Sequence, residues 1–171
     1  MIEKSFKKLM NTLPQQGKVE WIGLRPASKV PLNVVDAVVA DTDSGLIGDR
    51  FAGKFSQKRQ VTLIQSEHIE TVKSILKNPN ISPELMRRNI MVSGINLLAL
   101  KEHKFKIGDA ILEWTGLCQP CSRMEENLGE GGYNAMRGHG GITARVIESG
   151  EIKVGDAVYL EDAASSFSDE D

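Results

Sequence analysis

The sequence lacks most of the features that mark exported, membrane-spanning or nucleic-acid-binding proteins. Its 171 residues include only two cysteines. No apolar run approaches the roughly 18 residues that cross a membrane, and the polar start Met1-Ile-Glu-Lys4 leads into no apolar signal segment. The 21 Lys and Arg nearly balance the 23 Asp and Glu, for a net charge of -2. We therefore expect a cytoplasmic protein with reduced thiols whose partner is neither a membrane nor a nucleic acid.

Short apolar segments of alternating polarity, separated by turn residues, predict a mainly β fold with a few helices. The segments Phe105–Trp114 and Ile152–Leu160 each place a Gly-Asp turn between two short strands, which is common in β-barrels. Further strands are expected at 17–25, 34–40 and 59–65, and helices at 5–13, at 67–76 and from Pro83.

The length favours a single domain. We expect residues 1–16 to form an amphipathic helix that packs on the surface, followed by a linker. Residues 17–161 would form the domain, and residues 162–171 an acidic, disordered tail.

Both cysteines lie in Cys118-Gln-Pro-Cys121, directly after the apolar strand that ends near Trp114. Pro120 suits the first turn of a helix and Gly129 its end, so Cys121 is expected in that first turn. The helix start and the nearby Arg123 favour a thiolate, which is both a nucleophile and a soft metal ligand. The alternative is a buried, inert cysteine, and for Cys118 it is the favoured one.

Charged residues at three further places could face an anionic ligand. One place is the glycine-rich loop 45–53 with the basic stretch after it, the second precedes an apolar strand, and the third is the glycine-rich segment 131–145. Arginine suits bidentate contacts to anions, and glycine-rich backbone can cradle them. Each place also allows a structural interpretation, as a solvated loop, an internal ion pair or a flexible hairpin. The candidate binding residues are Asp49, Arg50, Arg59, Arg87, Arg88, Asn89, Arg137 and His139.

In their order and spacing these segments resemble the MOSC domain, the module homologous to the C-terminal part of molybdenum cofactor sulfurases. The resemblance extends from Gly17 to about Leu160, and Cys121 matches the characteristic cysteine of the family. Cys118 occupies a position that the family does not require. The segments that carry the resemblance are Gly45-Leu-Ile-Gly-Asp-Arg50, Arg59-Gln-Val-Thr-Leu63, Arg87-Arg-Asn-Ile90, Phe105-Lys-Ile-Gly-Asp109, Cys118-Gln-Pro-Cys121 and the turn at Gly155 and Asp156.

The resemblance implies a MOSC-type antiparallel β-barrel whose pocket holds the molybdenum cofactor, a molybdopterin. Cys121 would be the molybdenum ligand or would carry sulfur as a persulfide, in cofactor sulfur transfer or in the reduction of N-hydroxylated compounds. The partner would be the small-molecule cofactor or a sulfur donor or acceptor protein. The family is also associated with pyridoxal phosphate, but these 171 residues contain no pyridoxal-dependent sulfurase domain, so the chain resembles the small stand-alone bacterial members. Without an iron–sulfur domain, a complete reductase would need separate electron donors.

Three other functions stay open from the sequence. The chain could be a non-catalytic module that binds an anionic small molecule. It could be a dithiol redox protein that uses Cys118 and Cys121, although the β-rich flanks do not form the expected βαβ unit. It could also bind zinc, for which the CxxC pair and His139 would leave about one ligand missing.

Overall fold

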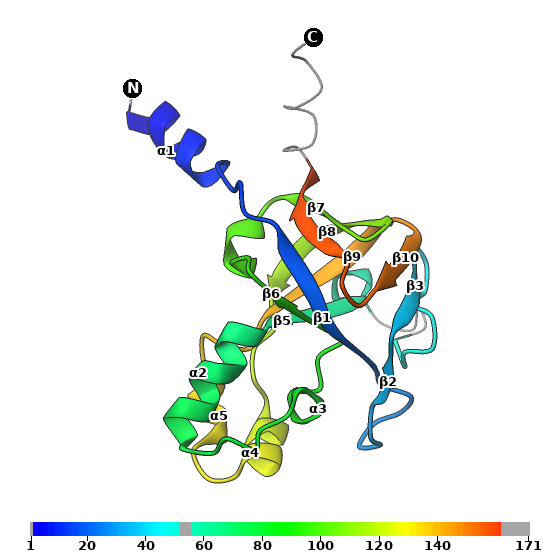
Figure 1. Cartoon of the computed structure of the whole chain (residues 1–171), viewed down its shortest axis with the longest axis vertical. Coiled ribbons are helices and arrows are strands. Elements are labelled where there is room, and N and C mark those ends of the chain that lie inside the picture. Colours follow the sequence, from blue (N-terminus) through cyan, green and yellow to red (C-terminus); the bar gives the residue numbers. More distant parts are fainter. Residues whose placement is uncertain (1, 52–55, 162–171) are drawn as a thin grey trace.

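The computed structural model describes residues 2–51 and 56–161, and seven strands of its main sheet close into a barrel (Figure 1). The predicted acidic tail, residues 162–171, lies outside the described residues. The strands are β1 (Gly17–Leu24), β2 (Asn33–Val35), β3 (Ala37–Asp41), β4 (Gly45–Leu46), β5 (Val61–Gln65), β6 (Ile90–Ser93), β7 (Lys104–Ile107), β8 (Ala110–Leu117), β9 (Ile142–Glu148), β10 (Gly150–Lys153) and β11 (Ala157–Leu160). The helices are α1 (Ile2–Met10), α2 (Ser66–Leu76), α3 (Pro83–Met86), α4 (Ser122–Leu128) and α5 (Gly132–Met136), with 3-10 turns η1 (Gln57–Arg59) and η2 (Leu97–Leu100).

The barrel follows the order β1, β11, β7, β8, β9, β5, β6 and back to β1. Neighbouring strands are antiparallel except for the parallel pair β5 and β6, whose connection carries α2 and α3. Strand β2 extends the sheet beside β1, and β10, β3 and β4 form a separate sheet of three strands. The predicted antiparallel barrel is thus confirmed, with one parallel exception.

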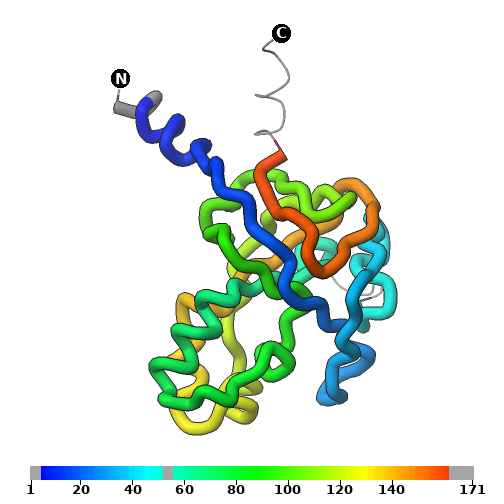
Figure 2. The backbone as a smooth tube through the Cα atoms, in the orientation of Figure 1, coloured from blue at the N-terminus to red at the C-terminus, as the bar shows by residue number. Residues whose placement is uncertain are grey.

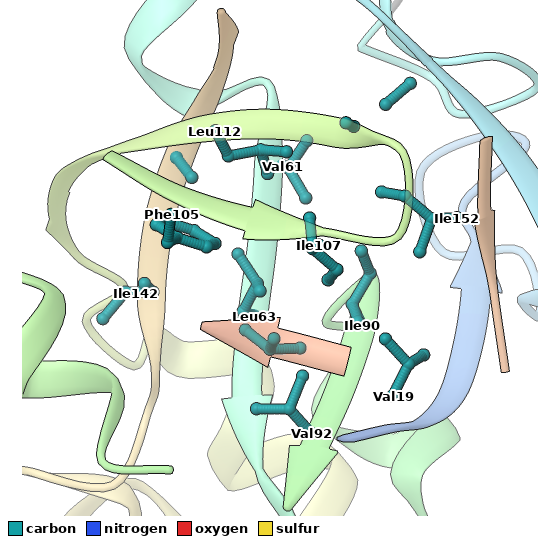
Figure 3. Packing of buried hydrophobic residues seen from close by; sticks show 14 of the residues in the cluster. Val19, Val61, Leu63, Ile90, Val92, Phe105, Ile107, Leu112, Ile142 and Ile152 are labelled. Atoms are coloured by element: carbon teal, nitrogen blue, oxygen red, sulfur yellow. The ribbon is translucent and has the colours of Figure 1, made fainter. Parts of the chain in front are cut away.

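Two apolar clusters hold the molecule together. The larger one fills the barrel with branched and aromatic side chains such as Phe105, Leu112 and Ile90 (Figure 3). The smaller one lies between the barrel and the helices α2 to α5, which gather at one end of the molecule (Figure 1). Strand β5 serves both clusters, because Leu63 belongs to the barrel interior and Ile64 to the helical cluster. This follows from the alternation of side chains along a strand.

The segment predicted as one strand, residues 34–40, is divided at Asp36 into β2 and β3. The two halves have different partners, since β2 pairs with β1 and β3 pairs with β10. The prediction was wrong because a change of sheet depends on distant partners and leaves the local alternation intact.

The segment expected to be a glycine-rich loop, residues 131–145, contains the helix α5 and most of β9. The Glu125 carboxylate accepts hydrogen bonds from the backbone N–H groups of Gly131 and Tyr133, each at 2.8 Å, at the start of α5. The bond from Tyr133 and then that from Gly131 lower the pKa of Glu125. Ala135 and Met136 are buried in the helical cluster, so tertiary packing overrides the poor helix propensity of the glycines.

The N-terminal helix α1 extends away from the barrel and does not pack on its surface (Figures 1 and 2). Phe6, Leu9 and Met10 are 64–67% exposed. A helix was predicted here, but at residues 5–13 instead of Ile2–Met10, and its expected packing on the surface was wrong. None of the helices in the described ranges is long and apolar enough to span a bilayer.

Candidate functional site

The cysteine segment leaves the end of β8 and leads into α4. Cys118 is buried at 4% exposure, whereas Cys121 is exposed, and both are free thiols. Cys121 is the residue before the first turn of α4, with an extended backbone (φ -126°, ψ 177°), so its expected place inside that turn was wrong by one residue. Gly129 ends the helix as predicted. The two cysteines therefore differ in access, and only Cys121 presents its sulfur to solvent.

A glycine turn before β9 holds the buried end of this segment. The Cys118 N–H donates to the carbonyl oxygen of Gly141 at 2.8 Å. A Cβ atom on Gly140 would lie 2.1 Å from the Cys118 carbonyl oxygen, and one on Gly141 would lie 1.9 Å from that of Leu63. Both glycines are required here because backbone approaches backbone too closely for any side chain.

The Arg88 side chain fixes the same two segments through hydrogen bonds to their backbone. Its side chain is almost fully buried, at 7% exposure, and donates to the carbonyl oxygens of Gly140 at 2.8 Å, Met86 at 2.9 Å and Cys118 at 3.4 Å. Among the described residues it has no carboxylate partner within salt-bridge distance, so backbone dipoles satisfy the charge. In this structure the guanidinium is a clamp on the cysteine and glycine segments.

Asp49 and Asn89 form a second buried network with Arg25. The Asp49 carboxylate accepts from Arg25 Nε at 3.2 Å and Nη2 at 3.0 Å, and from Asn89 Nδ2 at 3.0 Å. Burial raises the pKa of Asp49, but the hydrogen bonds and charge of Arg25 outweigh burial and bring the pKa below its usual range. Asn89 also donates to Gly23 O at 3.1 Å and accepts from the N–H and hydroxyl of Thr62. All four hydrogen-bonding positions of the Asn89 amide are thus used inside the protein.

Arg87 and Arg123 line a pocket of about 420 Å³ between α3, α4 and the segment 29–32 that precedes β2. Arg87 has a left-handed backbone (φ 57°), and its guanidinium donates to the carbonyl oxygens of Val30 and Ala27. Burial, followed by the positive charges of Arg123, Arg25 and Arg50, lowers the pKa of Arg87. Three cations, Lys29, Arg87 and Arg123, line this pocket against two carboxylates, so its lining carries a small excess of positive charge. We call it the basic pocket; its lining includes Lys29, Arg87, Arg123, Glu84, Glu126 and Asn127.

Comparison with known proteins decides the family. A sequence model of the MOSC domain matches residues 50–159, which are 110 of the 171 residues. The chain belongs to the MOSC domain family. The match ends one residue before the end of β11, so it includes most of the barrel, both cysteines and Arg87.

Solved structures share the fold of this MOSC protein. The YuaD protein of Bacillus subtilis is 21% identical with a TM-score of 0.75, covering 87% of this chain and 98% of its own. YiiM of Geobacillus stearothermophilus is 16% identical with a TM-score of 0.69, covering 84% and 74%, and YiiM of Escherichia coli is 16% identical with a TM-score of 0.64, covering 84% and 69%. At these identities the likeness shows the fold alone. No curated protein sequence matches the chain at a significant level.

The structure of this MOSC domain divides the predicted site residues into separate groups. Asp49, Arg88 and Asn89 are buried in internal hydrogen bonds, and the charge of Arg50 acts on Arg87 beside the basic pocket. Arg59 is exposed on η1, and Arg137 is exposed with a 3.5 Å contact to Asn134 Oδ1.

His139 lies in another place, where its ring packs edge-on against that of His68, with centroids 5.2 Å apart. Its Nδ1 lies 2.9 Å from the carbonyl oxygen of Ala135. Among the described residues, no cluster of three or more His, Cys, Asp or Glu side chains could hold a metal ion.

Sequence reasoning did not assign Arg25 or Arg123 to the site. Arg25 lies directly before Pro26, at the end of the predicted strand 17–25. A charged residue at a strand end was the available signal. Arg123 follows Cys121 by two residues and was considered only for its effect on the thiol. Its position two residues after Cys121 was the available signal. The sequence could not show that α4 packs beside α3 and so brings Arg123 close to Arg87.

Replacing Cys121 by serine in this MOSC domain is expected to stabilise the fold by about 0.5–1 kcal/mol. Cys121 occupies the N-cap of α4, and its side chain makes no capping hydrogen bond in the described structure. A serine hydroxyl could accept from the backbone N–H of Arg123 or Met124. Denaturant unfolding would measure the gain. Cys118→Ser, which buries a hydroxyl, should have the opposite sign, and an equal loss in both variants would contradict the assignment.

Proposed function

We propose that this MOSC domain binds the molybdenum cofactor, or a closely related phosphate-bearing pterin, and uses Cys121 as its reactive thiol. The observation that carries the proposal is an exposed free thiol two residues before Arg123, which lines the basic pocket with Arg87. The nucleophile and one of the two arginines are thereby presented by the same short helix and the residue before it.

The residues fit such a ligand in size and charge. A volume of about 420 Å³ lies within the usual range of small-molecule pockets. Phosphate groups are recognised by convergent arginines, and a thiolate is a soft ligand suited to molybdenum. When bound, the cofactor would supply the redox chemistry. Arg87 and Arg123 would neutralise the phosphate, and Cys121 would hold the metal.

Arg88 would act on this site indirectly. It clamps the carbonyl oxygen of Cys118, which fixes where the segment leading to Cys121 leaves the barrel. Asn89 donates to Asp49, and Asp49 holds Arg25, whose charge acts on Arg87. These buried residues would therefore position the binding groups and would not touch the ligand.

The exposure of the Cys121 thiol also supports a sulfur-carrier form of the same function. The thiolate would attack the terminal sulfur of a donor persulfide, forming a persulfide on Cys121 and releasing the donor as a thiol. This form needs access by a donor protein, which an exposed N-cap residue allows. Whether the domain serves sulfur transfer or the reduction of N-hydroxylated compounds depends on which species Cys121 carries.

The test is the cofactor and sulfur content of protein purified from molybdenum-replete cells. Molybdenum would be measured by elemental analysis, pterin by fluorescence after oxidation, and sulfane sulfur by cyanolysis. We expect Cys121→Ser to lose at least about tenfold of the metal or of the sulfane sulfur, and Cys118→Ser to retain both. Unchanged contents in Cys121→Ser would refute the proposal. Pterin retained without metal or sulfur in every protein would instead identify a non-catalytic anion-binding module.

Charge reversal in the basic pocket should weaken binding without unfolding the protein. Arg123→Glu replaces a half-buried cation that faces the pocket, and we expect pterin affinity to fall by about 10–100-fold, as for the loss of a charge-assisted contact. Lys18→Glu makes the same change of charge on the exposed side of β1 and serves as the control. Equal losses in the two variants would show that only the overall charge matters.

A further inference from the structure

A second hollow lies beside Cys118 and has a different character from the basic pocket. Its volume is about 120 Å³, and within the described part of the chain it shares no lining residue with the basic pocket. Leu97, Leu117 and Ile142 contribute apolar walls, and glycine backbone around Gly138 contributes the rest. An engineered apolar cavity of about 150 Å³ is large enough to bind benzene. The hollow is somewhat smaller than that cavity but is not closed, so it can take one small ring that extends partly beyond its walls.

One polar group that lines this hollow has no partner among the described residues. Gln65 is only 7% exposed, and its Oε1 accepts from the backbone N–H of Leu97 at 2.9 Å. The Gln65 amide nitrogen makes no hydrogen bond with any residue that the structure describes, although Gln65 lines the hollow. The bond from Leu97 occupies the oxygen end of the amide, so the nitrogen end is the one left free to donate to a ligand in the hollow.

The walls carry no strong charge. Neither a carboxylate nor a guanidinium group is among the described residues that line the hollow. His68 also lines it, and burial, followed by the charge of His139, lowers the pKa of His68, which favours the neutral ring. Arg88, the nearby cation, is occupied by backbone carbonyl oxygens. An uncharged ligand is therefore favoured over an ion.

The hollow has an exposed rim formed by Leu98, Leu117, Gln119 and Gly138. Leu98 and Leu117 are each 48% exposed and form the apolar part of this rim. Exposed leucines at the mouth also extend the apolar contact for a molecule slightly longer than the hollow.

We propose that this hollow is a binding site for small, uncharged aromatic molecules that carry one hydrogen-bond acceptor, which the free amide donor of Gln65 recognises. The ring lies against Leu97, Leu117 and Ile142, and the acceptor points to Gln65. A ligand in this position contacts Cys118 and Gln119, so it lies beside the segment that presents Cys121. The site is independent of the cofactor assignment, because it uses neither Cys121 nor the basic pocket.

The test uses benzamide and benzamidine, which have the same shape but present a carbonyl acceptor and a cationic donor respectively. Binding to the full chain would be followed by NMR, with the Gln65 side-chain amide and the Gly138 backbone amide as reporters. The wild type should bind benzamide about tenfold more tightly than benzamidine. Gln65→Glu keeps the oxygen that accepts from Leu97 and replaces the donor by a carboxylate, so at mildly alkaline pH it should reverse the preference.

A second variant keeps the proposal falsifiable if Gln65→Glu does not fold. Leu98→Trp places a large ring at the exposed mouth and should weaken benzamide binding by about tenfold or more. Ile75→Trp is the control: Ile75 is about as exposed as Leu98 but lies near the C-terminal end of α2, away from His68, which lines the hollow. This variant should leave binding unchanged. Benzamide shifts that miss both reporters, equal affinity for the two compounds in the wild type, or unchanged affinity in Leu98→Trp would each overturn the proposal.

Discussion

Arg88→Met is expected to lower the free energy of unfolding by about 3–4 kcal/mol, because it removes a buried charged donor from three carbonyl oxygens. The methionine fills similar space, but the carbonyl oxygens of Met86, Cys118 and Gly140 lose a donor that water cannot easily replace. For a chain of this length the loss corresponds to a fall of about 6–16 °C in Tm, measurable by calorimetry.

The matched control for this variant is Arg145→Met. Arg145 forms a surface ion pair with Glu113, at 2.7 Å between Nη2 and Oε2, and is about half exposed. Exposed pairs contribute roughly 0–1 kcal/mol, so this variant should unfold close to the wild type. Hydrogen exchange should also show that Arg88→Met loosens residues 118–121 and 138–141 more than the rest of the barrel. Uniform exchange, or equal losses for the two arginines, would contradict the role of Arg88 as a clamp.

Gly141→Ala is expected to cost about 3–5 kcal/mol or to prevent folding. The new Cβ would lie 1.9 Å from the Leu63 carbonyl oxygen, which belongs to a central strand and cannot move aside, and the backbone is left-handed at φ 86°. Denaturant unfolding of the soluble fraction would measure the loss.

Gly138→Ala separates the two causes of that loss. Gly138 is also left-handed, at φ 80°, but the space where its Cβ would lie is empty to 4 Å. It should cost only the backbone strain, about 1–2 kcal/mol. If the two alanine variants unfold at the same denaturant concentration, the close packing of the glycine turn on β5 does not contribute to stability.

The barrel could be predicted because its signals are local. Alternating polarity marks β1 and β8, and Gly-Asp turns mark the β7–β8 and β10–β11 connections. The closure of the barrel, the parallel pairing of β5 with β6, and the change of sheet at Asp36 depend on contacts between distant segments. The hydrophobic periodicity of the sequence contains no information on these contacts, so they become visible only in the structure.

The arrangement of the candidate site could be inferred from sequence only in part, for the same reason. The sequence indicated a reactive Cys121 and a set of arginines, and the structure places the sulfur at the surface. The sequence could not show that Arg88 donates all of its recorded hydrogen bonds to backbone carbonyl oxygens, because a buried arginine and a ligand-binding arginine look alike in sequence. It also did not separate the basic pocket from the apolar hollow beside Cys118, since that distinction depends on which elements pack together.

The role of the Cys121 sulfur is tested most directly by native mass spectrometry of protein isolated from molybdenum-replete cells. Wild type and Cys121→Ser would be compared under identical conditions, with Cys118→Ser as the control for a missing thiol. The account predicts a bound pterin cofactor or one additional sulfur atom on the wild type and on Cys118→Ser, and neither on Cys121→Ser. The same added mass on Cys121→Ser would contradict it.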